Sequence, residues 1–225
     1  MHSPPGSSTI CLRVWGDYAC FTRPEMKVER VSYEVMTPSA ARNILQAICW
    51  KPAIDWEVQR IDVLRPIRWT SVRRNEVGAV ASSQGALTAM KSGHGRLGLY
   101  VEDERQQRAG MILRDVEYLI HARFHMTGRA GPGDNPGKFA DMFRRRAERG
   151  QCAWQPYLGC REFAAYFAPA GDDAREPIAD TRELGWMLHD FDYDSQPNPA
   201  PGFFEAKLEA GCMAVPPRVL VEVQP

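Results

Sequence analysis

The chain has 225 residues, of which 44% are hydrophobic and 25% charged, and this balance excludes an intrinsically disordered protein. Basic and acidic residues are equal in number at 28 each, so a polyanion must be met by a local basic patch rather than by net charge. No apolar run approaches the ~18 residues of a membrane span. The scattered cysteines and the missing secretion signal predict free thiols and a cytoplasmic protein without membrane contact.

The first predicted elements are a strand and a helix. Residues 9–15 alternate apolar and polar side chains, which predicts a strand with one face on a core. Gly16-Asp17 is expected to break this strand before a second extended segment over 18–21. Thr37-Pro38 has the signature of a helix N-cap followed by proline at the first helical position. We expect this helix to end before Pro52.

Two further strands are predicted on either side of a long irregular stretch. Residues 54–63 alternate like a strand but slip by one position, which indicates a bulge. Residues 70–110 are dominated by Ser, Gly, Ala and charged side chains, and we predict a long loop there. Residues 116–126 predict a third strand, whose polar face carries His121, Arg123 and His125.

A short helix over 135–150 is the most informative segment. Asn135 is the expected N-cap, and Lys138 in the first turn lies beside free backbone N–H groups at the positive end of the helix dipole, where a phosphate would be held. The apolar stripe consists of Phe139, Met142 and Phe143, and the cations that follow include Arg144, Arg145 and Arg149. Cations on a helix face are most often a solvated surface, so this helix by itself does not establish binding of nucleic acid.

The end of the chain predicts more β structure. The expected strands are 157–167, 184–193 and 203–214, with a polar linker over 171–183. The order strand–helix–strand–strand–helix–strand is typical of ferredoxin-like and RNA-recognition folds. We therefore predict an α+β protein: a ferredoxin-like βαββαβ domain over residues 1–170, followed by a small C-terminal antiparallel β part over 171–225.

Two histidines on the third predicted strand are candidate acid–base groups. His121 and His125 share a face, but four residues of strand span ~13 Å, too far for both to bind one metal ion. Either could transfer protons at neutral pH, although a half-exposed sheet histidine is the simpler interpretation. Motifs for nucleotide cofactors or serine hydrolases are absent from the sequence, and we expect neither a metal nor a cofactor. Polyanion binding remains, with single-stranded RNA as the leading partner.

Several sequence blocks together resemble the CRISPR-associated Cas-five family of subtype I-C, also called the Dvulg type. The resemblance covers nearly the whole chain, and Leu-Gly-Cys-Arg-Glu-Phe163 and Trp-Lys-Pro52 are its more specific parts. The blocks, in chain order, are Val14–Thr22, Ser32-Tyr33, Thr37–Ala40, Trp50–Pro52, Arg73–Glu76, Gly137-Lys138, Phe143–Arg146 and Gln155–Phe163.

This resemblance implies a protein of the RAMP superfamily, with a ferredoxin-like (RRM-like) domain and a small C-terminal β part. Members resemble metal-independent endoribonucleases that cut the repeat of precursor CRISPR RNA and remain on the 5′ handle within the Cascade complex. The implied partners are precursor and mature CRISPR RNA and the backbone and large subunits of Cascade, with DNA as an open alternative. No cofactor is implied.

The resemblance also implies catalytic positions. The family site uses a tyrosine near the end of the first helix and a Lys-His pair opening the second, and these positions read Cys49, Lys138 and Phe139 here. Loss of one acid–base group typically costs ~10²–10⁴-fold in rate, so either other groups substitute or the protein only binds RNA. The possible substitutes are Tyr33, His121 and His125. The expected RNA-binding residues are Arg73, Arg74, Arg123, Arg144, Arg145 and Arg149. A non-catalytic CRISPR RNA-binding subunit and a generic interaction domain are the alternatives.

Overall fold

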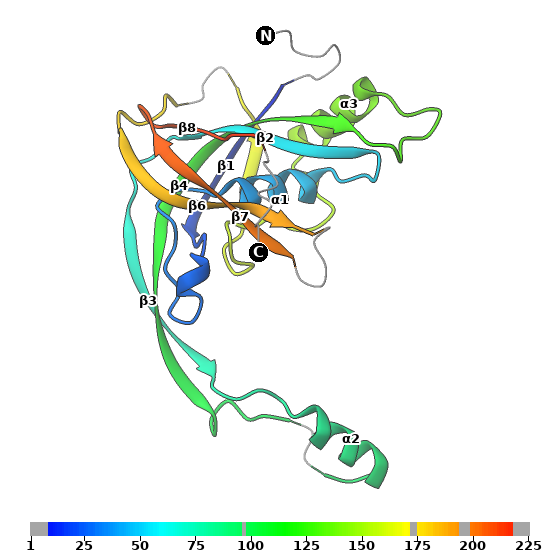
Figure 1. Ribbon diagram of the computed structural model, residues 1–225, viewed down its shortest axis with the longest axis vertical. Helices are drawn as coiled ribbons and strands as arrows, with labels where there is room; N and C mark the ends of the chain where they lie inside the picture. The colour runs from blue at the N-terminus through cyan, green and yellow to red at the C-terminus, as the bar shows by residue number, and fades with distance from the viewer. Residues whose placement is uncertain (1–8, 96–97, 172–174, 194–198, 218–225) are drawn as a thin grey trace, which may run out of the picture.

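The computed structural model describes residues 9–95, 98–171, 175–193 and 199–217, and it shows a mixed α/β protein with antiparallel sheets (Figure 1). The strands are β1 (Ile10–Ala19), β2 (Ile54–Val63), β3 (Trp69–Val77), β4 (Arg105–Met126), β5 (Tyr166–Pro169), β6 (Arg182–Asp192), β7 (Ala200–Leu208) and β8 (Cys212–Ala214). The main sheet has the order β5-β1-β4-β2-β8, and β3 pairs with β4 outside this row. Strands β6 and β7 form a separate two-stranded sheet.

Two helices contribute to the core beside the main sheet, and both begin as predicted. The Thr37 hydroxyl accepts a hydrogen bond from the backbone N–H of Ala40 at the start of α1 (Pro38–Ile48). The Asn135 side chain accepts one from the N–H of Lys138 at the start of α3 (Pro136–Glu148). A 3-10 turn, η1 (Pro24–Met26), and a third helix, α2 (Ser83–Ser92), complete the described helices.

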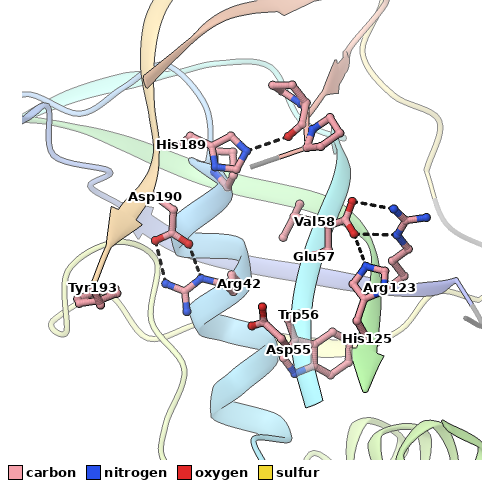
Figure 2. A pocket seen from close by; sticks show the side chains of 13 residues that line it. Arg42, Asp55, Trp56, Glu57, Val58, Arg123, His125, His189, Asp190 and Tyr193 are labelled. Atoms are coloured by element: carbon pink, nitrogen blue, oxygen red, sulfur yellow. Dashed lines mark hydrogen bonds and ion pairs between the residues drawn. The ribbon is translucent and has the colours of Figure 1, made fainter. Parts of the chain in front are cut away.

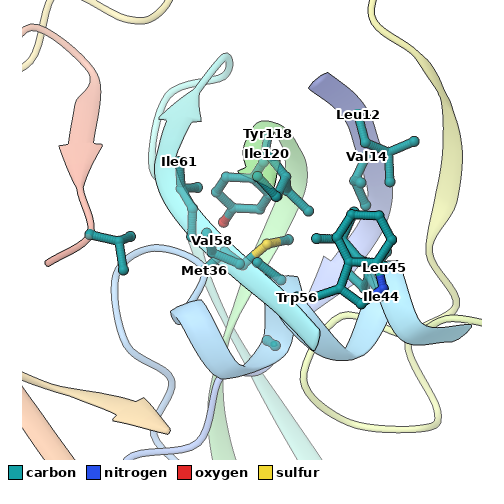
Figure 3. Packing of buried hydrophobic residues seen from close by; sticks show 14 of the residues in the cluster. Leu12, Val14, Met36, Ile44, Leu45, Trp56, Val58, Ile61, Tyr118 and Ile120 are labelled. Atoms are coloured by element: carbon teal, nitrogen blue, oxygen red, sulfur yellow. The ribbon is translucent and has the colours of Figure 1, made fainter. Parts of the chain in front are cut away.

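The hydrophobic core lies between one face of the main sheet and the helices α1 and α3, and Figure 3 shows the part beside α1. Alternate residues of each strand point into it, because successive side chains of a strand face opposite sides. Tyr118 and Ile120 of β4 are 2% and 0% exposed, and Ile44 of α1 is 1% exposed. The predicted inward faces of residues 9–15 and 116–126 are therefore confirmed.

Two details of the first strands can now be compared with their predictions. The bulge predicted in 54–63 is confirmed, since the pairing of β2 with β4 shifts register between Val58 and Arg60. The break predicted at Gly16-Asp17 is wrong, because β1 continues to Ala19. A Cβ added at Gly16 would lie 2.6 Å from the Leu158 Cδ1 atom, so the glycine serves a close packing contact inside the strand rather than a turn.

The long loop predicted over 70–110 is wrong as well. This stretch contains β3, α2 and the first part of β4, which together form an arm that extends from the body and carries α2 at its far end (Figure 1). The residues of β3 alternate only between exposed and half-buried. Since no residue of β3 is buried, the apolar alternation that marks a strand with one face on a core is missing from the sequence.

The strands predicted near the C-terminus need two corrections. The strand predicted over 157–167 is limited to β5, and the residues before it form a loop closed by an isolated bridge between Tyr157 and Ala164. The strand predicted over 203–214 is divided into β7 and β8 by a turn at Ala210 and Gly211, both with positive φ. Strand β8 pairs with β2, so the C-terminal part contributes a strand to the main sheet.

The strand predicted over 184–193 is confirmed as β6, which begins two residues earlier. Part of the predicted linker 171–183, residues 172–174, lies outside the described residues. The β6–β7 sheet rests on α1 through a pair of hydrogen bonds between Arg42 and Asp190, at 2.6 and 2.9 Å. No helix in the described part of the chain is long and apolar enough to cross a membrane.

Candidate functional site

The start of α3 presents an exposed amine, as the sequence predicts. The side chain of Lys138 is 47% exposed, and its Nζ lies 2.8 Å from Asp134 Oδ1. The hydrogen bond from Lys138 lowers the pKa of Asp134 below its usual value, with help from the Gly131 N–H and the charge of Lys51. Lys138 therefore lies at the positive end of a helix, where a phosphate is favoured, and an incoming phosphate would compete with the Asp134 carboxylate for its amine.

The other two catalytic positions implied by the resemblance are buried. Cys49 is 0% and Phe139 3% exposed, and both belong to the core. Burial raises the pKa of the Cys49 thiol, although the charges of Arg146 and Lys51 oppose it. Because neither side chain reaches solvent, the structure argues against proton transfer by either residue.

Tyr33, the first suggested substitute, is also buried, with 1% of its surface exposed. Its hydroxyl accepts a hydrogen bond from the Leu188 N–H at 3.2 Å, beneath β6. Burial raises the pKa of this hydroxyl. Tyr33 therefore fixes the β6–β7 sheet against the body, and its position argues against a role in chemistry.

His121 lies on the face of β4 opposite the core and belongs to a closed polar cluster. Its Nε2 is 2.7 Å from Asp62 Oδ2 and 2.9 Å from Arg60 Nη2, and its Nδ1 is 3.5 Å from Cys11 Sγ. Burial opposes the charge of Asp62, but the hydrogen bond and charge of His121 outweigh it, so the pKa of Asp62 is lowered. Both ring nitrogens of His121 already have neighbours.

His125 lies near the end of β4 and is more open, with 46% of its side chain exposed. Its Nε2 faces Glu57 of β2, which also accepts two hydrogen bonds of 2.9 Å from Arg123. The bond from Arg123, and next that from His125, lower the pKa of Glu57 against the effect of burial. Glu57 thus orients the imidazole ring through Nε2.

These side chains line a cavity of about 540 Å³ (Figure 2). It lies at the edge of β2, with Asp55, Glu57 and His125 on one side and the Arg42–Asp190 pair of α1 and β6 on the other. The cavity contains charges of both signs, and most of them are paired with each other. Within the described residues, no group of three or more His, Cys, Asp or Glu side chains is placed to hold a metal ion.

The six arginines predicted to bind RNA do not form one surface. Arg123 faces Glu57, whereas Arg73 and Arg74 lie on β3, where Arg74 pairs with Glu162. The remaining three, Arg144, Arg145 and Arg149, are exposed on or beside α3. Of these, Arg144 pairs with Asp141 at 3.2 Å. The structure therefore separates the predicted residues into groups on β4, α3 and the arm.

Sequence reasoning missed Lys51, Asp134, Glu57 and Asp62. A signal for the last two existed, because the predicted strand 54–63 has a polar face that includes them. What the sequence did not indicate is the antiparallel register, in which Glu57 pairs with Arg123 and Asp62 with Leu119. Lys51 acts on Asp134 because the turn after α1 lies beside the loop after β4, where the Thr127 hydroxyl donates to the Pro52 carbonyl at 2.6 Å, and this tertiary contact has no local signature.

A family profile and two curated relatives all indicate the same protein family. The sequence profile of the CRISPR-associated protein family Cas5, type Cas5d, matches residues 9–216. The chain is 51% identical to the CRISPR pre-crRNA endoribonuclease Cas5d of Mannheimia succiniciproducens, over 97% of this chain and 99% of that protein. It is 40% identical to the protein of the same name from Thermus thermophilus, over 91% of this chain and 90% of that one.

Solved structures share the fold at lower identity. The crystal structure of a CRISPR-associated protein matches with a TM-score of 0.66 and 22% identity, over 92% of this chain and 91% of the other. A chain of a CRISPR RNA-guided surveillance complex matches with a TM-score of 0.51 and 14% identity, over 93% of this chain and 90% of the other. At these identities the likeness concerns the fold alone.

Proposed function

This chain belongs to the Cas5d group of the CRISPR-associated Cas5 family, and from that premise we propose that it is an endoribonuclease that cuts the repeat of precursor CRISPR RNA. The observation that carries the proposal is the 51% identity, over almost the full length of both chains, to a protein named a CRISPR pre-crRNA endoribonuclease. A nuclease of this kind needs a cation at the scissile phosphate and groups that move protons.

We assign the cation to Lys138. In a metal-independent cut, the ribose 2′-OH attacks the adjacent phosphorus, the bond to the 5′ oxygen breaks, and a cyclic phosphate remains. Negative charge accumulates on the phosphoryl oxygens in the transition state, where a preorganised ammonium group is most effective. Lys138 is exposed at the helix start, and the Asp134 carboxylate that holds it also feels the charge of Lys51.

We assign proton transfer to His125. It is the most exposed of the three suggested substitutes, and β4 runs directly from it into the loop that leads to α3. Glu57 holds Nε2, so Nδ1 is the nitrogen available to the RNA. His121 is the less favourable choice, because it is 18% exposed and both its ring nitrogens have polar neighbours.

We further propose that residues 1–170 form the predicted ferredoxin-like domain and that 171–225 are a C-terminal β part, which adds β8 to the main sheet. The order β5-β1-β4-β2 and the connections through α1 and α3 support this topology. The product RNA would remain bound, and the protein would act in the cytoplasm with the backbone and large subunits of Cascade. The shared fold with a chain of a CRISPR RNA-guided surveillance complex is consistent with that assembly.

The test is cleavage of cognate repeat RNA in EDTA. Wild-type protein is expected to give one discrete cut, and a 2′-deoxy nucleotide at the scissile position should abolish it. Lys138→Ala and His125→Ala should each lose ~10²–10⁴-fold in rate. Lys91→Ala and His94→Ala change exposed residues in and just after α2 and serve as matched controls. Undiminished cutting by the His125 variant would remove that residue from the mechanism.

The burial of Cys49 and Phe139 favours a second candidate, a non-catalytic subunit that grips CRISPR RNA. It predicts tight binding of the repeat without any cut, with an affinity that falls steeply as salt rises. A binding titration run beside the cleavage assay separates the two functions. Absence of binding at physiological salt would contradict both.

A further inference from the structure

Two of the sequence blocks that carry the family resemblance, Val14–Thr22 and Gln155–Phe163, meet at a place that the proposed cleavage does not use. Cys20, directly after β1, donates its backbone N–H to the Leu158 carbonyl oxygen at 3.0 Å. Gly159 has φ +84°, and a Cβ there would lie 2.1 Å from the Cys20 carbonyl oxygen. The loop that carries Cys160 is therefore packed directly against the backbone of Cys20, and only glycine allows this approach.

The two thiols share their polar neighbours. Thr22 Oγ1 lies 3.5 Å from Cys20 Sγ and 3.8 Å from Cys160 Sγ. Cys160 Sγ is also 3.5 Å from the Cys20 carbonyl oxygen, and Arg30 Nη1 is 4.0 Å from the same sulfur. Cys160 is half-buried, whereas Cys20 is 1% exposed. One thiol of the pair is thus accessible, and the other lies behind it.

The surroundings of the two thiols also shift their pKa values in opposite directions. The hydrogen bond from Cys20, helped by Thr22 and the charge of Arg30, lowers the pKa of Cys160 to about 6, against the effects of burial and Glu162. The same contact raises the pKa of Cys20. The more acidic thiol is thus the more exposed one, which matches an attacking sulfur in front of a resolving one.

We propose that Cys160 and Cys20 form a modification site at which hydrogen peroxide oxidises the two thiols to a disulfide. The Cys160 thiolate attacks one peroxide oxygen, the O–O bond breaks, and a sulfenic acid forms while the departing oxygen takes a proton to give water. The Cys20 sulfur then attacks the sulfenic sulfur and releases a second water, so two thiols lose two electrons and the peroxide gains them.

The other cysteines lack this combination. Cys49 is fully buried, and burial raises the pKa of Cys11 to about 11. Cys212 has its pKa raised by burial and by a hydrogen bond with Asp62. Cys152 is half-buried like Cys160, and among the described residues no hydrogen bond or ion pair joins it to a cation. The reaction should therefore select one pair.

A disulfide at this place would act on the base of the arm. Glu162, two residues after Cys160, pairs with Arg74 of β3. It also pairs with Arg30, whose Nη1 lies 3.4 Å from Glu162 Oε1. Arg30 also approaches Glu76 of β3 at 3.8 Å. The disulfide would join the end of β1 covalently to the loop of Cys160 and Glu162, and Glu162 is the residue that pairs with β3. We therefore expect the arm to move less relative to the body.

The experiment treats the full-length protein with hydrogen peroxide, blocks remaining thiols with an alkylating reagent, and maps peptides by mass spectrometry without reduction. Wild-type protein should give one linked peptide pair containing Cys20 and Cys160, and reductant should remove it. Cys160→Ser and Cys20→Ser should abolish the link, whereas Cys152→Ser should leave it unchanged. Arg30→Gln should slow its formation, because it removes the cation beside the attacking sulfur.

If a serine variant fails to fold, measurements on wild-type protein alone still test the proposed disulfide. Alkylation of Cys160 in the native protein, followed against pH, should reach half its maximal rate near pH 6. The proposal is overturned if peroxide leaves both thiols free, or if it oxidises Cys152 first. Repeat cleavage is measured separately on reduced protein, so loss of the proposed nuclease function would not affect this result.

Discussion

The two faces of strand β4 show how one segment serves two purposes. Tyr118, Ile120 and Phe124 face the core and are at most 3% exposed. Glu117, His121 and Arg123 alternate with them and form ion pairs with side chains of β1 and β2. Neighbouring residues therefore differ in what a substitution should disturb. On one face it should affect stability, and on the other it should affect charge arrangement and chemistry.

The largest expected effect is on the core face, at Phe124. Its ring packs edge-on against Trp56 with centroids 5.4 Å apart. Phe124→Ala should cost ~3–5 kcal/mol of unfolding free energy, because it removes buried apolar surface and leaves a cavity. Urea unfolding followed by circular dichroism measures this loss.

The neighbouring variant Arg123→Ala provides the contrast. Arg123 lies on the open face and is partly exposed, so its pair with Glu57 should contribute ~0–1 kcal/mol. Similar destabilisation by both variants would contradict the distinction between the two faces.

The next largest loss of stability is expected at Glu117, an exception to the difference between the two faces of β4. Glu117 lies on the polar face, yet its side chain is 0% exposed, and it accepts hydrogen bonds from Arg13 at 2.7 Å and Arg65 at 2.8 Å. Glu117→Gln removes a buried charge and leaves two arginines near a neutral amide. Since both arginines are about one-third exposed and retain solvent, we expect ~1–3 kcal/mol, less than for a fully buried ion pair.

The measurement is again urea unfolding, with Glu57→Gln as a matched variant on the same face. Glu57 retains 24% exposure and should lose less stability than Glu117. Equal losses would mean that burial does not determine the strength of these pairs.

The sequence predicted the core faces well because burial leaves a periodic record. Residues 9–15, 54–63 and 116–126 each alternate, and each forms a strand with one buried face. The helix starts at Thr37 and Asn135 were equally readable, since an N-cap is a local chemical event. The strands of the arm could not be predicted in this way, because β3 has no buried face and its sequence therefore lacks the apolar alternation.

The candidate site was less predictable than the fold. Lys138 could be placed at a helix start from its neighbours in sequence alone. The partners of His125 and His121 come from another strand, and their identity depends on a register that includes a bulge. The burial of Cys49 and Phe139 was partly visible, because Phe139 belongs to the apolar stripe of its helix. Tertiary pairing, rather than local pattern, determines the rest.

A smaller effect should appear when pH is lowered. The pKa of Glu57 is lowered first by its bond from Arg123, and that of Asp62 by His121 despite burial. A carboxyl group whose folded pKa lies below its unfolded value stabilises the protein above that unfolded value, about pH 4, and loses this contribution as pH falls through the folded pKa. Stability should therefore decline below about pH 4.

Unfolding of wild-type protein and of a Glu57→Gln, Asp62→Asn double variant between pH 2.5 and 7 measures this contribution. The variant should be less stable near neutral pH and should lose less stability on acidification. An identical pH slope for the two proteins would show that these carboxylates do not differ between the folded and unfolded states.

The smallest effect should occur where β4 leaves the body and its two faces become equivalent. Gln106 and Gln107 are successive residues of the arm, so they point to opposite sides, and both are exposed. Their alanine variants should each change unfolding free energy by less than ~0.5 kcal/mol, as is usual for surface positions. A marked loss at only one of them would indicate that one side of the arm is covered in solution, for example by a second copy of the chain. Sedimentation of that variant against wild type would then test for an interface, because removing a covering contact should shift the protein toward monomer.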